Sequence, residues 1–159
     1  MIHSLHHMAF RCRDSEETRA FYEDVIGLEL AAALPIEATK TGRPVRVLHT
    51  FFRMHDGSFL AFFEVPEAPF EFKPQHDFDL HIALRADDEA VERATAAARA
   101  RGLEIRGPSD HEFITSVYFR DPNGYVVELA VPTENHADYV DPATNNARQI
   151  LDAWMKVEA

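Results

Sequence analysis

The sequence predicts an α+β fold made of two similar halves, and two observations carry that prediction. An amphipathic strand pattern over 5–14 returns over 80–88, and each copy holds a histidine at the same place, His7 and His81. Each copy is followed by a helical stretch that stops at a Gly-Leu-Glu turn and then by about three short strands. The order strand, helix, strands therefore occurs twice. Such halves either close on each other within one chain or are exchanged between two chains.

The first module is expected over about 1–68. Its opening segment alternates apolar and polar side chains, which is typical of a strand with one buried face. A helix should follow, because Asp14 or Ser15 can accept hydrogen bonds from the free amides of its first turn. The stretch from Leu30 to Val45 contains prolines and a glycine and is expected to be a surface excursion. The expected strands lie at 5–12, 45–54 and 58–65.

The second module is expected over about 77–132, after a proline-containing linker at 66–78. An alanine-rich helix should span 90–101, and the turn at 121–124 should join the last two strands. The strand pattern over 80–88 opens this module, and further strands are expected near 103–106, 113–120 and 125–131. Both modules together form one predicted domain over 1–140.

The tail, 141–159, is predicted to form a separate helix, centred on 143–157. Ile150, Leu151 and Trp154 fall on one side of it, which favours a docking element or a dimer contact.

Composition excludes several classes of function. A formal charge of −11 argues against nucleic acid and against an anionic membrane as partners, because both require a basic surface. The single cysteine, Cys12, excludes an internal disulfide and fits a reducing compartment. The chain starts without a basic and apolar leader, and no apolar stretch approaches the thickness of a bilayer. We therefore expect a cytoplasmic protein.

Four side chains at matched strand positions are the candidates for chemistry. His7 and His81 lie on the first strand of each module, and Glu64 and Glu128 lie on the last. Strand parity places the histidines opposite the residues that pack on the helices, and we expect both glutamates on the same face. Burying an unpaired carboxylate is costly, so each glutamate needs solvent, an ion pair or a metal. Two imidazoles with one or two carboxylates suit a divalent metal such as Fe(II), Mn(II), Ni(II), Co(II) or Zn(II).

These segments resemble the vicinal oxygen chelate superfamily, which includes glyoxalase I, extradiol dioxygenases and resistance proteins of the bleomycin and fosfomycin type. The resemblance covers 2 to about 132, and it depends on 7–11 with 21–28, on 81–84 and on 121–128. It implies two βαβββ modules that form a curved mixed sheet around a divalent metal. It also implies a small substrate that offers two neighbouring oxygens and a homodimeric protein.

Within that superfamily, the segment from Asp110 to Glu128 is similar to the extradiol dioxygenase motif. This resemblance implies that His7, His81 and Glu128 are the ligands of Fe(II) or Mn(II). It also implies that His111 and Tyr118 are catalytic groups that contact substrate and oxygen. His111 and Tyr118 are an odd number of residues apart, so His111 must precede the strand if both are to reach the metal. Ring cleavage of a catechol-type substrate is the leading interpretation.

Two alternatives remain open. The set His7, Glu64, His81 and Glu128 is similar to the four ligands of bacterial glyoxalase I, in which a ligand carboxylate moves a proton. That resemblance implies a lyase or isomerase with Ni(II), Co(II) or Zn(II) that acts on a hemithioacetal or a 2-oxo substrate, with Glu64 as a catalytic group. However, nothing after Glu64 supplies the asparagine expected of that family. The other alternative is a resistance-type protein that binds a small molecule without catalysis.

Overall fold

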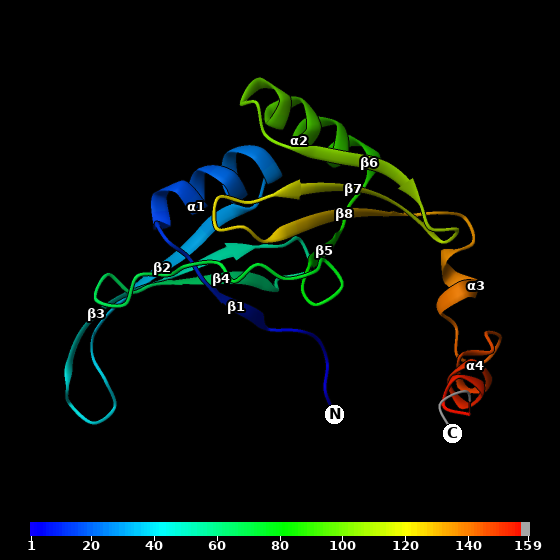
Figure 1. The fold of residues 1–159 in the computed structure, drawn as a ribbon, viewed down its shortest axis with the longest axis horizontal. Helices are drawn as coiled ribbons and strands as arrows, with labels where there is room; N and C mark the ends of the chain where they lie inside the picture. The colour runs from blue at the N-terminus through cyan, green and yellow to red at the C-terminus, as the bar shows by residue number, and fades with distance from the viewer. Residues whose placement is uncertain (157–159) are drawn as a thin grey trace.

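The computed structural model describes residues 1–156, and it confirms the α+β class and the duplication (Figure 1). The first module runs through β1 (His7–Arg11), α1 (Ser15–Phe21), the π-helical turn η1 (Tyr22–Ile26), β2 (Glu29–Ala38), β3 (Pro44–Arg53) and β4 (Phe59–Glu64). The second runs through β5 (Ile82–Arg85), α2 (Asp88–Ala100), β6 (Ile105–Asp110), β7 (Ile114–Arg120) and β8 (Val126–Pro132). The tail holds α3 (His136–Val140) and α4 (Ala147–Trp154).

Each module forms a four-stranded sheet, and the two sheets have the same topology. The strand orders are β1-β4-β3-β2 and β5-β8-β7-β6. In both sheets the first strand pairs parallel with the last, and the remaining pairs are antiparallel. His7 pairs with Phe59 in the first sheet, and Ile82 pairs with Val127 in the second. These registers decide which side chains share a face.

The helices of the two modules begin at the predicted caps and end close to the predicted glycines. Asp14 caps α1, and its Oδ1 accepts hydrogen bonds from the amides of Glu16 and Glu17, each at 2.8 Å. The helical segment ends at Gly27, whose φ of 91° is a left-handed conformation that glycine adopts without strain. Asp87 caps α2 in the same way by accepting from the amide of Ala90.

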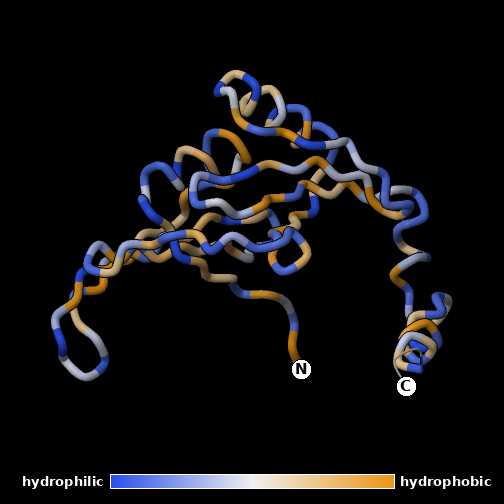
Figure 2. The backbone as a smooth tube through the Cα atoms, in the orientation of Figure 1, coloured by the Kyte–Doolittle hydropathy of each residue, from blue (hydrophilic) through white to orange (hydrophobic). Residues whose placement is uncertain are grey.

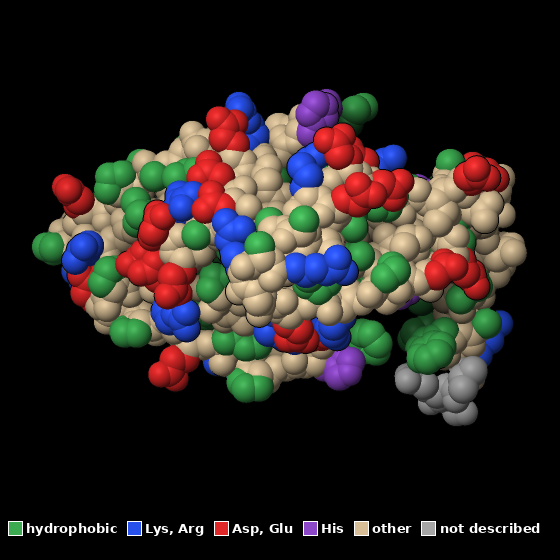
Figure 3. Space-filling view, turned by 90° about the horizontal axis from the view of Figure 1, so that it is seen from above, with side chains coloured by type: hydrophobic (Ala, Val, Ile, Leu, Met, Phe, Trp, Pro, Cys, Tyr) green, Lys and Arg blue, Asp and Glu red, His purple; other side chains and the backbone are tan. Residues whose placement is uncertain are grey.

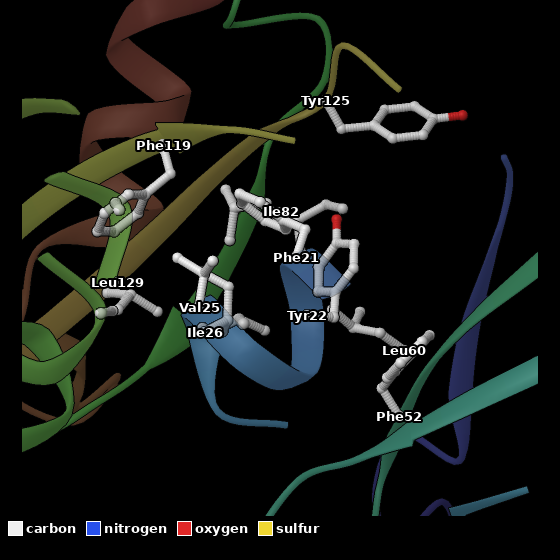
Figure 4. Close-up of a cluster of buried hydrophobic side chains, with 14 of the residues drawn as sticks. Phe21, Tyr22, Val25, Ile26, Phe52, Leu60, Ile82, Phe119, Tyr125 and Leu129 are labelled. Carbon is white, nitrogen blue, oxygen red and sulfur yellow. The ribbon is translucent and has the colours of Figure 1, made fainter. Parts of the chain in front are cut away.

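Both modules share one hydrophobic core beneath their helices. Figure 4 shows Val25 and Ile26 of η1 beside Leu129 of the second module, while Tyr22 faces Phe52 and Leu60 of the first. In Figure 1, α1 and α2 lie on the same side of the molecule, above the strands. The helix-facing sides of both sheets are therefore buried in this core.

A polar cluster inside the core joins the two modules. The carboxylate of Asp121, in the turn before β8, accepts hydrogen bonds from Tyr22 Oη at 3.1 Å and from the amide of Tyr125 at 2.8 Å. Asn123 of the same turn accepts from the amide of Arg13 at 2.8 Å and donates from Nδ2 to Thr18 Oγ1 at 3.2 Å. The turn thus binds α1 and the end of β1 directly.

The surface agrees with the acidic composition. Hydrophobic stretches follow the helices and strands, and the tip of the β2–β3 hairpin is hydrophilic (Figure 2). Acidic side chains (red) and Lys and Arg side chains (blue) are spread over the face seen from above (Figure 3). Among residues 1–156, no helix combines the length and the apolar character needed to cross a bilayer.

Two expectations about the elements need adjustment. The segment expected as a surface excursion is largely exposed, but it is not irregular, because strand β2 occupies Glu29–Ala38. This strand is at the edge of its sheet, where Pro35 is tolerated although it lacks an amide donor, and its register shifts twice. In the tail, α4 spans Ala147–Trp154, and position 157 of the predicted helix lies outside the described residues.

Candidate functional site

His81 and Glu128 are brought together on the open face of the second sheet. His81 immediately precedes β5, and Glu128 lies in the middle of β8, paired with Ala83. His81 Nε2 and Glu128 Oε2 are 3.4 Å apart, and the side chains are 41% and 6% exposed. The pair therefore combines an accessible imidazole with a buried carboxylate.

The hydrogen bond on the far side of the imidazole determines its tautomer. His81 Nδ1 lies 3.0 Å from the backbone carbonyl oxygen of Asp77. A carbonyl oxygen only accepts, so Nδ1 carries the hydrogen, and Nε2 of the neutral ring presents its lone pair to Glu128. Two electron-pair donors that face each other require a cation between them, either a proton or a metal ion. The pair thus fits a divalent metal, and a carbonyl partner on Nδ1 is the usual support of a metal-binding histidine.

The second oxygen of Glu128 is held by β7. Ser116 Oγ donates to Oε1 at 2.5 Å, and Tyr118 Oη lies 3.4 Å from the same oxygen. Ser116 and Tyr118 pair with Ala130 and Glu128 across the strands, which puts all of them on one face. Oε1 is thereby fixed within the protein, while Oε2 points to His81.

His111 adjoins this group through Tyr118. The two side chains meet at 2.8 Å between His111 Nε2 and Tyr118 Oη. His111 lies in the turn between β6 and β7, which Glu112 closes with a φ of 70°. The strand parity problem is thereby resolved, because His111 precedes the strand. Burial, followed by the negative charge of Glu128, raises the pKa of Tyr118 above its usual value, so the phenol keeps its proton at neutral pH.

His7 occupies the equivalent face of the first sheet, away from that group. It is exposed, its Nδ1 lies 2.8 Å from His6 Nδ1, and its ring lies 6.1 Å from that of His49. Within residues 1–156, no three His, Cys, Asp or Glu side chains are close enough to hold one metal ion. A single chain therefore brings together His81 and Glu128, but it does not bring His7 to them.

The structure corrects the expected position of Glu64. It pairs with Leu48 and shares its face with Leu60 and Phe62, which are buried toward the helices. Its Oε2 accepts a hydrogen bond from the amide of Ser15 at 2.8 Å, at the start of α1. The expectation that Glu64 lies on the same face as His7 is wrong.

The register gives the physical reason for that error. Ala9 and Ala83 each lie two residues after the histidine of their module, and they pair with Ala61 and Glu128, respectively. Ala61 is thus the position equivalent to Glu128. Glu64 is three residues further along, and an odd number of residues reverses the face.

Sequence reasoning missed three residues around the site. Ser116 could have been found from its spacing of two from Tyr118, because both then lie on one strand face. His49 is buried on the same face as His7 and stacks on Phe63 at 3.6 Å, although its position in the sequence shows no motif. Asp77 contacts His81 only through a turn of the linker, for which the sequence offers no signal.

Comparisons with known proteins agree with this architecture. The family model described as the Glyoxalase/Bleomycin resistance protein/Dioxygenase superfamily matches residues 4–129. A glyoxalase/dioxygenase from Nostoc punctiforme is 27% identical, with a TM-score of 0.60 and coverage of 82% of this chain and 92% of that chain. The antibiotic binding protein TnmS3 from Streptomyces sp. CB03234 is 25% identical, with a TM-score of 0.60 and coverage of 83% and 98%.

The fold is also shared with a protein whose structure contains a metal. A variant of the fosfomycin resistance protein FosX from Listeria monocytogenes, complexed with Mn(II) and 1S,2S-dihydroxypropylphosphonic acid, is 23% identical. Its TM-score is 0.62, and the match covers 86% of this chain and 98% of that chain. No curated protein matches this chain.

Proposed function

The chain belongs to the glyoxalase/bleomycin resistance protein/dioxygenase superfamily, and on that premise we propose that it is a metal-dependent enzyme acting on a small substrate with two neighbouring oxygens. Extradiol-type cleavage of a catechol-like ring is the reaction that its site supports best. The observation that carries this proposal is a chain of contacts, in which His111 Nε2 lies 2.8 Å from Tyr118 Oη and Tyr118 Oη lies 3.4 Å from Glu128 Oε1. Both groups are neighbours of the metal-type pair His81 and Glu128 and are available for proton transfer.

His81 and Glu128 would hold a divalent metal, with His7 as the third ligand. Such a metal supplies Lewis acidity and open positions for the substrate oxygens and O₂. Tyr118 would donate its phenolic hydrogen bond to a substrate oxygen, and His111 would exchange a proton with Tyr118 Oη across the 2.8 Å contact. Ser116 keeps Oε1 of Glu128 occupied, which leaves Oε2 for the metal.

The position of Glu64 favours three ligands over four. A glyoxalase-I-type site needs a carboxylate from the first module beside the metal, whereas Glu64 faces α1 and accepts from Ser15. Ala61, at the equivalent position, offers no donor atom. The position equivalent to Glu128 therefore lacks the carboxylate that would carry the proton in that reaction.

The proposed site is completed by a second copy of the chain. The helix-facing sides of both sheets are buried in one shared core, and within one chain His7 does not reach His81 and Glu128. A two-fold dimer would bring His7 of one copy to His81 and Glu128 of the other, twice. Mn(II) and Fe(II) are the metals we propose.

Mixing two inactive variants tests this arrangement. His7→Ala and Glu128→Ala each remove a ligand from every site of their own homodimer. Refolded together in equal amounts, they should recover about a quarter of the wild-type sites, because half the dimers are mixed and each holds one intact site. Metal content by elemental analysis is the readout, and a mixture that binds no more metal than its components would contradict the shared site.

Substrate assays test the reaction. The protein with Fe(II), air and a panel of catechols should give yellow ring-cleavage products. Glu128→Gln should abolish both metal retention and product, whereas Glu112→Gln, an exposed glutamate of the β6–β7 turn, should change neither. If no catechol of the panel gives product and a hemithioacetal is turned over instead, the dioxygenase proposal is overturned.

A second candidate is a binding protein without catalysis. Its support is the 25% identity to the antibiotic binding protein TnmS3. Stoichiometric binding of a small aromatic compound by metal-free protein, with no turnover after metal addition, would favour this candidate.

A further inference from the structure

The segment that presents His81 has little structure of its own. Residues 65–81, between β4 and β5, form no helix or strand. A short turn closes its end, where the carbonyl oxygen of His76 accepts from the amide of Asp79 at 2.8 Å. The direction of the His81 ring therefore depends on what holds this turn against the sheet.

Asp77 connects the turn to the sheet with both of its acceptor groups. Its carbonyl oxygen accepts the Nδ1–H of His81 at 3.0 Å. Its carboxylate accepts from Arg106 Nη2 of β6 at 2.7 Å and lies 3.7 Å from Arg120 Nη2 of β7. Glu104 lies 3.7 Å from both arginines, so the charges alternate around a closed ring. The ion pair with Arg106 is the short contact of this ring and fixes the place of the Asp77 backbone.

We propose that Asp77 and Arg106 are positioning residues, whose ion pair holds the Asp77 carbonyl where it fixes the tautomer and direction of His81. In the absence of this hold, the imidazole is free to rotate and to carry its hydrogen on either nitrogen. The expected effect on metal affinity rests on the proposed function, whereas the expected effect on the tautomer of His81 does not.

Arg106 also contacts Tyr118, and an experiment must separate the effect of this contact from that of the ion pair with Asp77. Its guanidinium carbon lies 5.6 Å from the centre of the Tyr118 ring, so a change at Arg106 also acts on Tyr118. The carboxylate of Asp77 bonds to the arginines and to neither Tyr118 nor Glu128. An effect shared by variants at both positions therefore reports the ion pair.

The test uses Arg106→Gln, Asp77→Ala and the double variant. The matched controls are Arg93→Gln and Glu89→Ala, which break an exposed 2.8 Å ion pair on α2, outside the site. One readout is the tautomer of His81 in metal-free protein at pH 8, from two-bond ¹H–¹⁵N correlations of the imidazole. The other is the dissociation constant for Mn(II).

We expect wild-type protein and both controls to show His81 with its hydrogen on Nδ1. Arg106→Gln and Asp77→Ala should show a mixture of tautomers and bind Mn(II) roughly 10-fold more weakly, the lower end of the effect of lost support around a metal ligand. The double variant should be no weaker than either single variant, because the pair acts as a unit.

Two results would overturn the inference. One is an unchanged His81 tautomer in both single variants; the other is Mn(II) affinity within twofold of the controls. Failure of wild-type protein to bind Mn(II) would refute the proposed function instead, and the tautomer measurement would still decide the role of Asp77 and Arg106. If Asp77→Ala does not fold, Asp77→Asn removes the negative charge of the side chain and retains its shape.

Discussion

Replacing Asp121 by alanine should destabilise the whole chain, because this carboxylate joins the modules inside the core. It is 4% exposed and accepts four hydrogen bonds, from Tyr22 Oη, Asn123 N, Asn123 Nδ2 and Tyr125 N, at 2.8 to 3.1 Å. Each buried donor left without a partner costs about 1–3 kcal/mol. Water in the vacated space and relief from burying a charge offset part of that sum.

We therefore expect Asp121→Ala to lower the free energy of unfolding by about 3–5 kcal/mol. At about 2–4 °C per kcal/mol for a chain of this size, the melting temperature should fall by roughly 10 °C. Urea unfolding followed by circular dichroism measures the first quantity, and a thermal scan measures the second. Asp141→Ala is the matched control, because Asp141 accepts from the amide of Ala143 at 2.8 Å in an exposed turn, and its loss should cost about 1 kcal/mol or less. If Asp121→Ala costs no more than Asp141→Ala, the assignment of Asp121 as the joint between the modules is refuted.

The pH dependence of the same site has a definite sign. Burial outweighs the hydrogen bonds and raises the pKa of Asp121 above its usual value. The folded state then holds this proton more tightly than the unfolded state, so the contribution of Asp121 to stability is complete below pH ~3.9 and falls as the pH rises through the folded pKa. Asp121→Asn does not titrate, so its stability deficit against the wild type should be larger at pH 4 than at pH 7. A deficit that grows toward pH 7 would contradict this sign.

Three further predictions follow from single contacts. Glu64→Gln should keep Mn(II) affinity within twofold of wild type, by metal titration, because its side chain bonds to the amide of Ser15 and faces away from the site; a loss of metal would restore the four-ligand set. Tyr118→Phe should retain the metal but lower the rate of ring cleavage by about 10²-fold or more in steady-state assays, as expected for a lost general acid. Gly124→Ala should cost about 2–3 kcal/mol in urea unfolding, because φ is +104° and a Cβ would lie 2.6 Å from the Phe72 ring; a loss below 0.5 kcal/mol would contradict that fit.

The face that His81 occupies could be predicted from sequence because β5 alternates. Ile82 and Leu84 are buried in the core, whereas Ala83 and Arg85 are exposed, and the pairing of Ala83 with Glu128 puts Glu128 on the face of His81. The odd spacing of His111 and Tyr118 likewise required a turn between them, and the structure has one. Where one face of a strand differs from the other, local pattern suffices to place a side chain.

The first half could not be predicted in the same way. Phe59, Leu60, Ala61, Phe62 and Phe63 are apolar on both faces of β4, so nothing in the strand itself indicates which face Glu64 occupies. The pairing of Ala9 with Ala61 settles it, and that pairing depends on how β1 lies against β4. Local pattern also fails to indicate strand β2. Pro35 lies inside it, and a proline inside a segment indicates a break unless the strand is known to be at the edge of its sheet.

The sequence by itself determined the duplicated α+β architecture, the caps of the helices and the candidate residues of the second module, because these depend on spacing along the chain. Only the tertiary structure decided that His81 and Glu128 meet without His7, that Glu64 supports α1, and that Asp77 holds the imidazole. Strand register and contacts across the linker join residues that are far apart in the chain. Such contacts are set by the packing of the shared core, and no local pattern encodes them.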